Sequence, residues 1–273
     1  MRYFEFAPTG VLQPYIKCIW ALEAEAAGPT GEYEKILPDG CPELLFHYGA
    51  PFEKKDGHGA HLKTHFFVHG QLSRYIELKP TAETGVIGVR FKPFGLAAFT
   101  GLPQFRLKDD TFSVDSVFSC ADSYIAERIN EAETIKGKII VLENFLVKNL
   151  LVNKKTFRHD TINGLAYAVN EIKASAGNVN LDGIACRLNI SGREIERRFR
   201  TCIGLSPKQL SKIFRFNQVL NKSAHIADLT HMAYLAGYYD QSHFIRDFRE
   251  FSGVNPSTFF KQENKFTEFF YDK

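Results

Sequence analysis

The chain has 273 residues, of which 44% are hydrophobic and 24% are charged, a composition typical of a soluble globular protein with one large or two ordinary domains. Runs of 18 or more apolar residues are missing, and the first residues do not resemble a secretion signal, so we expect a cytoplasmic protein without a membrane partner. The five cysteines are odd in number and scattered, which argues against a disulfide framework or a zinc knuckle.

The net charge of +3 hides an asymmetry along the chain. Residues 1–154 carry 17 basic and 19 acidic side chains, whereas residues 155–273 carry 17 basic and 12 acidic ones. Between Arg187 and Lys222 the count is nine basic residues against two acidic ones. This concentration of positive charge predicts a surface for a polyanion, although a solvated helix face has the same signature.

The first 115 residues are predicted to be rich in β-strands. Apolar runs between turn residues predict strands at 66–70, 74–78 and 85–91, and the sequence PDG at 38–40 predicts a tight turn. From residue 116 the apolar residues recur every three or four positions, which predicts two helices after the sheet. The polar run 153–160 is then a linker.

Beyond the linker the periodic segments predict helices. An apolar stripe from Ile162 to Ile172 follows a cap at Asp160 or Thr161, and Gly177 supplies the stop. Ser191 and Glu194 have the spacing of a capping box, in which each side chain satisfies a free backbone N–H, so we expect Glu194 to cap its helix. The sequence SPKQ at 206–209 repeats that arrangement, with proline at the first helical position.

Two short segments of this helical part share one outline. FRTCIGLSP at 199–207 and FREFSGVNP at 248–256 match in phenylalanine, glycine and proline at a spacing of 49 residues. Upstream of each lies a small-residue helix, around Ala185 or Ala233. Four residues later stands Asn189 or Gly237, residue types that enter left-handed backbone conformations at low cost. Helix, turn and arginine-bearing second helix form the outline of a helix-turn-helix, present twice.

The sequences LDGIACRLNISGREIERRFRTCIGLSP and HMAYLAGYYDQSHFIRDFREFSGVNP resemble the tandem helix-turn-helix domain of the AraC/XylS family of bacterial transcription regulators. The resemblance extends from Leu181 to Phe259. ILPDGCPELLF, HGQL and VRFKPFGLAAF resemble a domain of unknown function that precedes such domains. Together these matches imply an α+β multidomain fold: a β-rich, cupin-like domain with following helices, then an all-α tandem helix-turn-helix domain.

On this basis we expect a β-rich sensor or interaction domain at 1–115, a helical segment at 116–153, the DNA-binding domain at 154–262 and an aromatic tail at 263–273. The resemblance implies a sequence-specific regulator that inserts two recognition helices into successive major grooves. Its implied partners are double-stranded DNA, RNA polymerase, a small-molecule effector and a second copy of the chain. We expect no cofactor, and the direction of regulation stays open.

The family's base contacts fall on the second helix of each unit, which we call its reading helix. Arginine binds guanine O6 and N7 bidentately, and glutamate accepts a hydrogen bond from cytosine N4. The expected base contacts are Arg193, Glu196, Arg197, Gln241, Ser242, His243 and Arg246. Arg200, Lys208 and Arg249 are suited to phosphates, although solvation explains them almost as well. The alternative for Arg193 and Arg197 is an ion pair with Glu194 or Glu196 one turn away.

The role of the N-terminal aromatic residues stays open. They line a pocket for an apolar or planar effector, or they pack in a filled core: Trp20, Tyr48, Phe91 and Phe94. Four histidines within twelve residues suggest a metal, but their mixed strand and loop pattern gives them no common face, so no metal is expected: His58, His61, His65 and His69.

Two other classes of function stay open as well. A DNA-targeted enzyme of the alkyl-transfer repair type bears the same kind of DNA-binding domain and needs a nucleophilic cysteine. Cys18 and Cys41 lie beside no supporting histidine or metal motif, so we expect no catalytic residue. A scaffold that has lost DNA binding is favoured by Asn189 in place of the usual glycine and by Gly192 inside the reading helix.

Overall fold

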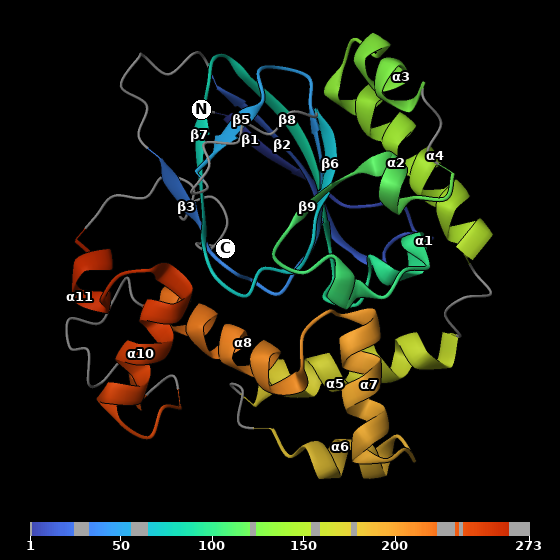
Figure 1. The fold of residues 1–273 in the computed structure, drawn as a ribbon. Coiled ribbons are helices and arrows are strands. Elements are labelled where there is room, and N and C mark those ends of the chain that lie inside the picture. Colours follow the sequence, from blue (N-terminus) through green and yellow to red (C-terminus); the bar gives the residue numbers. More distant parts are fainter. Residues whose placement is uncertain are drawn as a thin grey trace.

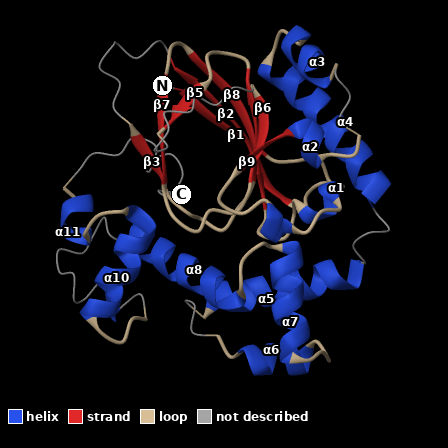
Figure 2. Ribbon diagram, in the orientation of Figure 1, coloured by secondary structure: helices blue, strands red, loops and turns tan. Residues whose placement is uncertain are grey.

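The computed structural model describes residues 2–24, 33–55, 65–120, 124–153, 159–175, 179–222, 233–234 and 237–261. A β-rich N-terminal part lies against a helical C-terminal part, and Figure 1 shows the two as separate layers. Figure 2 shows that the strands are confined to the first part. The predicted fold class is therefore confirmed. Gly177, His58, His61 and the aromatic tail lie outside the described residues.

The N-terminal strands form two antiparallel sheets. The larger sheet has six strands, in the order β1 (Arg2–Phe6), β2 (Ile16–Ala24), β8 (Thr84–Phe91), β4 (Glu43–His47), β6 (Phe66–His69) and β9 (Thr111–Ser113). The smaller sheet has the order β3 (Glu34–Ile36), β7 (Ile76–Pro80) and β5 (Phe52–Lys54). The strands expected at 66–70 and 85–91 are confirmed, and the one expected at 74–78 begins two residues later.

Both faces of the inner strands of the larger sheet, such as β2 and β8, are buried. Along β2 the side chains of Ile19 and Ala21 pack toward the helices, whereas those of Trp20 and Leu22 pack toward the smaller sheet. This alternation follows from the pleat of a strand, which sends successive side chains to opposite faces. The two sheets therefore face each other across a core of their own, and every second residue of the larger sheet points into it.

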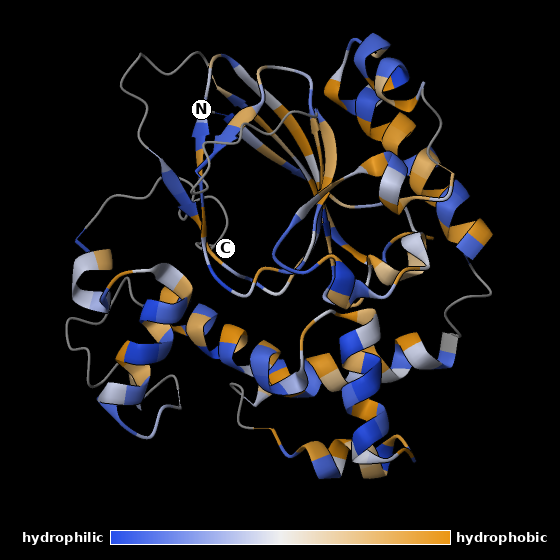
Figure 3. Ribbon diagram, in the orientation of Figure 1, coloured by the Kyte–Doolittle hydropathy of each residue, from blue (hydrophilic) through white to orange (hydrophobic). Residues whose placement is uncertain are grey.

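Helices cover the outer face of the larger sheet. They are α1 (Ala97–Thr100), the short 3-10 helix η1 (Gln104–Arg106), α2 (Val114–Val117), α3 (Ile125–Glu131) and α4 (Ile135–Asn153). The last two confirm the predicted helical pair. Phe145 of α4 packs against Phe66 of the sheet, with ring centroids 6.1 Å apart. Figure 3 shows hydrophobic residues along the strands and in these helices.

The C-terminal part consists of helices around a phenylalanine-rich core. They are α5 (His159–Ala174), α6 (Leu181–Arg187), α7 (Gly192–Cys202), α8 (Pro207–Lys222), α10 (Gln241–Ser252) and α11 (Pro256–Phe259). Phe199, Phe216, Phe244 and Phe248 are completely buried. The cap expected at Asp160 or Thr161 is wrong, because α5 already begins at His159 and both residues lie inside its first turn.

Side-chain caps fix where several of these helices begin. Ser191 Oγ accepts a hydrogen bond from the N–H of Glu194 at 3.2 Å, and Asp240 Oδ1 accepts one from the N–H of His243 at 2.7 Å. Ser206 and Gln209 cap each other reciprocally, with distances of 3.2 Å and 3.0 Å, which confirms the second predicted capping box. These caps satisfy N–H groups that the first turn of a helix leaves without partners.

Candidate functional site

The two helix-turn-helix units have the same turn. Asn189 and Gly237 both adopt the left-handed conformation, with φ of 51° and 75°, as the sequence predicted. In the first unit the N–H of Ile190 donates to the carbonyl of Ala185, and in the second the N–H of Tyr238 donates to the carbonyl of Ala233, both at 3.0 Å. Each bond joins a residue to the fifth residue before it, so the sequence repeat is a repeat of backbone geometry as well.

The reading helix of the first unit, α7, is strongly amphipathic. Ile195 and Phe199 are buried on one side of it, whereas four of the predicted DNA contacts are exposed on the other: Arg193, Glu196, Arg197 and Arg200. Residues three, four and seven positions apart share a helix face, so these side chains form one charged stripe. Gly192 is the first residue of the helix and has open space around it, so its low helix propensity has little effect there.

Glu194 is engaged by arginine rather than by the backbone. Its carboxylate accepts hydrogen bonds from Arg197 Nε and Nη2, at 2.7 and 2.8 Å, and from Arg198 Nε, at 2.7 Å. These bonds lower the pKa of Glu194 to about 2. The prediction that Glu194 completes a capping box is therefore wrong, because two guanidinium groups hold the carboxylate. The intrahelical pair that was weighed for Arg197 is present.

The reading helix of the second unit, α10, exposes the predicted contacts Gln241, Ser242, Arg246 and Arg249, whereas His243 is only half-exposed. Asp247 is completely buried beneath the helix and accepts a hydrogen bond from Lys212 Nζ of α8 at 2.9 Å. His243 Nε2 lies 3.4 Å from the same carboxylate. The remaining predicted contact, Lys208, is exposed near the start of α8. A buried charged pair thus fastens α10 to α8.

The N-terminal domain touches the first unit through η1. The guanidinium of Arg200 lies over the ring of Phe105, 4.7 Å from its centroid. Next to this pair a Cβ at Gly204 would stand 2.8 Å from the carbonyl oxygen of Gln104, so the two backbones are in close contact. A cleft of about 590 Å³ separates Phe105 and Lys108 from the charged stripe of α7. The charged stripe of α7 is thus exposed, and Phe105 and Lys108 of the N-terminal domain lie on one side of it.

The smaller sheet touches the second unit at the end of α10. The N–H of Tyr75 donates to the carbonyl of Phe251 at 3.1 Å, and Lys35 Nζ donates to the carbonyl of Ser252 at 2.7 Å. Lys35 also lies over the Tyr75 ring, 4.5 Å from its centroid. The last carbonyls of a helix have no partner within the helix, and a cation there is favourable, so the N-terminal domain supplies the missing partners.

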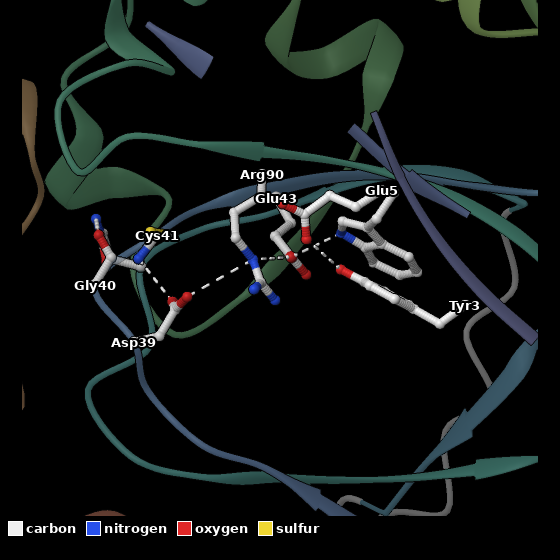
Figure 4. Close-up of polar contacts among 9 residues, drawn as sticks. Tyr3, Glu5, Asp39, Gly40, Cys41, Glu43 and Arg90 are labelled. Atoms are coloured by element: carbon white, nitrogen blue, oxygen red, sulfur yellow. Dashed lines mark hydrogen bonds and ion pairs between the residues drawn. The ribbon is translucent and has the colours of Figure 1, made fainter. Parts of the chain in front are cut away.

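A polar network lies between the two sheets (Figure 4). Glu43 Oε1 accepts hydrogen bonds from Arg90 Nε at 2.8 Å and from Trp20 Nε1 at 3.2 Å. Arg90 also lies 3.7 Å from Asp39, whose carboxylate accepts from the N–H of Cys41 at 2.8 Å. Burial raises the pKa of Glu43, and the charge of Arg90 opposes that rise.

Beside this network lies a cavity of about 60 Å³. Its walls include Trp20 and three further polar side chains, His47, His69 and Thr111. The sequence had suggested His69 only as a metal ligand, which was not expected, and had not suggested His47 or Thr111. The signal was available, because the strand alternation in FFVH places His69 and Phe67 on the face opposite to Phe66 and Val68. The sequence does not, however, show which strands become neighbours, so it does not show which of these side chains line the same cavity.

The four aromatic residues considered for a ligand pocket are not brought together. Trp20 lines the cavity, and Phe91 is buried in the core under the helices. Tyr48 donates a hydrogen bond to Glu23 at 3.1 Å on the helix-facing side. Phe94 lines a cleft of about 680 Å³ between the N-terminal domain and helices α5 and α8.

The histidines and cysteines show no metal or nucleophile arrangement in the described ranges. Among those residues no group of three or more histidine, cysteine or acidic side chains could hold a metal ion. His65 Nδ1 lies 3.2 Å from the carbonyl of His47, and burial raises the pKa of the Cys18 thiol to about 11. Along the same part of the chain, no helix has both the length and the apolar character needed to cross a membrane.

Comparisons with known proteins agree with this geometry. A family model described as a helix-turn-helix domain matches residues 184–262, and one described as a domain of unknown function matches residues 4–113. A solved structure of ToxT from Vibrio cholerae is 10% identical, with a TM-score of 0.46 over 95% of this chain and 98% of that one. ToxT bound to (E)-4-(8-methylnaphthalen-1-yl)but-3-enoic acid is 12% identical, with a TM-score of 0.44 over 88% and 96%. No curated protein sequence matches the chain.

The matched family model and the two identical turns define the class: the C-terminal part is a helix-turn-helix DNA-binding domain. Its tandem arrangement, with the sequence strings quoted above, resembles that of the AraC type. The matched model covers residues 184–262, and in this part the chain is similar to transcription regulators of that type.

Proposed function

We propose that this regulator places α7 and α10 in successive major grooves of one DNA duplex, under control of a small-molecule or protein signal at its N-terminal domain. The observation that carries the proposal is the pair of units with the same turn, each exposing a polar reading helix. They are joined by α8, whose 16 residues span about 24 Å. A rod of that length separates the units by a distance of the order of the roughly 34 Å groove repeat.

We assign base contacts to the stripe of α7 and to the first turns of α10: Arg193, Glu196, Arg197, Gln241, Ser242, His243 and Arg246. Arg200, Lys208 and Arg249 contact phosphates. The ion pair between Arg197 and Glu194 does not conflict with this assignment, because the Arg197 side chain is 67% exposed and an exposed pair contributes little in water. Arg197 therefore exchanges its partner for a base at small cost.

The N-terminal domain has to shift before α7 enters a groove. A helix inside a major groove about 12 Å wide has phosphates on both sides. Phe105 and Lys108 occupy one of those sides, and Phe105 contacts Arg200, which is assigned here to a phosphate. The signal therefore acts by loosening this contact. RNA polymerase and a second copy of the chain are further proposed partners, on the family resemblance alone.

The test begins with selection of bound duplexes from a random DNA pool, followed by anisotropy titrations. Phe105→Ala should raise affinity for the selected duplex about two- to fivefold, because an exposed cation–π contact contributes about 0.5 to 1 kcal/mol. Phe4→Ala is the matched control, since the two rings are 39% and 38% exposed and Phe4 lies on β1. Failure to enrich any sequence overturns the DNA-reading proposal. Equal affinities of the two variants overturn only the role of Phe105.

A further inference from the structure

The cavity between the sheets is large enough for a small molecule. A water molecule needs roughly 10 to 15 Å³ on this measure, so about 60 Å³ has room for about four waters or one small ring. Most of the wall is apolar, and it includes Leu22, Leu45, Phe52, Phe67 and Leu78. Ligand pockets in proteins usually combine such walls with a few placed polar groups.

Some of the polar side chains that line the cavity have atoms without a hydrogen-bond partner. His69 is 8% exposed, and its Nε2 has no partner, nor has Thr111 Oγ1. His69 Nδ1 lies 3.0 Å from the carbonyl of Gly70, which can only accept, so the proton of the neutral ring is on Nδ1. Nε2 is then an acceptor in need of a donor. Leaving such a buried atom without a partner costs about 1 to 3 kcal/mol.

The charge balance of the cavity favours an uncharged occupant. Burial lowers the pKa of both His47 and His69 to about 4, so both rings are neutral at pH 7. Glu43 is already paired with Arg90 at 2.8 Å. Lys54 contributes the cation of the wall, from a half-exposed position on β5. An anion would have only this partly solvated partner and would lose its hydration in an apolar chamber.

We propose that this cavity binds an uncharged, mainly apolar molecule that donates a hydrogen bond to Nε2 of His69, and that its occupancy alters how the smaller sheet holds the end of α10. The ligand class stands on the cavity alone. The regulatory part rests on the proposed function.

The route to α10 passes through two pairs of neighbouring residues. Ile36 of β3 and Ile76 of β7 are cross-strand partners, and both line the cavity. Lys35 and Tyr75 precede them directly, and these are the two residues that bond the last carbonyls of α10. Successive side chains of a strand point to opposite faces. A ligand that presses on Ile36 and Ile76 therefore displaces the backbone from which Lys35 and Tyr75 reach α10.

Trp20 offers a direct binding assay, because it is the single tryptophan of the chain and lines the cavity. We would titrate the full chain with phenol, toluene and benzoate, exciting Trp20 where these compounds do not absorb. Phenol has a donor, toluene has the same size without one, and benzoate is an anion. Phenol should change the emission saturably and bind about tenfold more tightly than toluene, as one buried hydrogen bond predicts. Equal binding of toluene, tighter binding of benzoate, or no saturable change with phenol overturns the ligand class.

His69→Phe keeps a ring but removes the acceptor. It should lower the affinity for phenol about tenfold and leave that for toluene unchanged. His69→Gln, which restores an acceptor, should recover part of the loss and serves if the phenylalanine variant fails to fold. Unchanged phenol binding in a folded variant overturns the role of His69.

The proposed link between the cavity and the end of α10 is tested by amide hydrogen exchange at residues 249–254 with and without phenol. Exchange there should change when phenol binds, and Lys35→Met should abolish that change while leaving the Trp20 response intact. If phenol binds without altering exchange in the unmodified chain, the route is overturned and the ligand class stands. DNA titrations of the same variants distinguish failure of this route from failure of the proposed function. Loss of binding to the selected duplex in the absence of phenol concerns the reading helices alone.

Discussion

The two halves of the chain place the polar side chains of their candidate sites differently. In the N-terminal domain they lie between the sheets: Glu43, His47, His69 and Arg90. In the C-terminal domain they stand on the outer sides of α7 and α10: Arg193, Arg197 and Arg246. An interior polar group depends on its neighbours, and changing it affects stability. An exterior group is solvated, and changing it should affect partners instead.

The largest expected effect is that acid lowers the stability of the N-terminal domain, through its buried histidines. The folded pKa of His47 and of His69 is about 4, below the ordinary value of 6.5, so the unfolded chain takes up protons first as the pH falls. The stabilisation is complete above about pH 6.5 and is lost between there and pH 4, on the order of 3 kcal/mol for each ring. Urea unfolding followed through Trp20 at pH 7 and pH 5 measures this loss.

The control for this prediction is the double variant His47→Phe, His69→Phe, which should lose most of the pH dependence. Other titrating groups near the two rings are His65, Asp109 and Asp110, with Lys54 as a fixed charge. If the double variant keeps the full dependence, these neighbours and not the buried rings are responsible.

Arg90→Met should have the next largest effect. Arg90 is 8% exposed and Glu43 is 17% exposed, so removing the guanidinium leaves a buried carboxylate without its main partner. Breaking such a pair from one side typically costs about 3 to 5 kcal/mol. Adding Glu43→Gln should restore most of the free energy of unfolding, because the side chain at position 43 is then uncharged, while Asp39 keeps its hydrogen bond from the N–H of Cys41. A loss that the second substitution does not reduce would show that packing, and not charge, dominates.

Arg197→Ala and Arg246→Ala should leave stability nearly unchanged and weaken binding to a selected duplex by about 1 to 3 kcal/mol each, with relaxed preference at one base pair. The measurement is an anisotropy titration at two salt concentrations. Arg187→Ala is the matched control, because Arg187 is exposed on α6 and bonds Tyr167 at 2.7 Å. If all three variants weaken binding equally on specific and random DNA, the reading-helix assignment fails.

Glu194→Ala should have the smallest effect on stability, below about 1 kcal/mol, even though its carboxylate accepts three hydrogen bonds. Ser191→Ala should cost about 1 kcal/mol, because it removes the side chain that caps α7. Thermal unfolding of the two variants compares them directly. A larger loss for Glu194→Ala would mean that its arginine pairs, although exposed, are cooperative.

Local rules of sequence predicted much of the C-terminal domain. The left-handed turns at Asn189 and Gly237 and the caps at Ser191 and Ser206 depend on neighbours within a few residues, and all are present. The prediction for Glu194 was wrong because Arg197 and Arg198 bind its carboxylate in place of the backbone N–H of Ser191. The capping pattern does not show which of these donors the carboxylate binds.

The interior of the N-terminal domain was harder to predict. Lys35 and Tyr75 meet α10 across more than 170 residues of chain, and His69 meets Trp20 through strand pairing between distant segments. Period-two patterns state which side of a strand a residue faces, but they do not state which strands become neighbours. The cavity and both domain contacts therefore needed the structure.

The glycines of the sequence repeat carry one more consequence. Gly204 and Gly253 occupy equivalent positions, both are left-handed with φ of 89° and 76°, and each lies against a different piece of the N-terminal domain, Gln104 or Tyr75. Each unit of the repeat thus has its contact with the N-terminal domain at the same position. The N-terminal domain therefore contacts both units at once, so on the proposed function a change in its shape would alter the separation of the two reading helices.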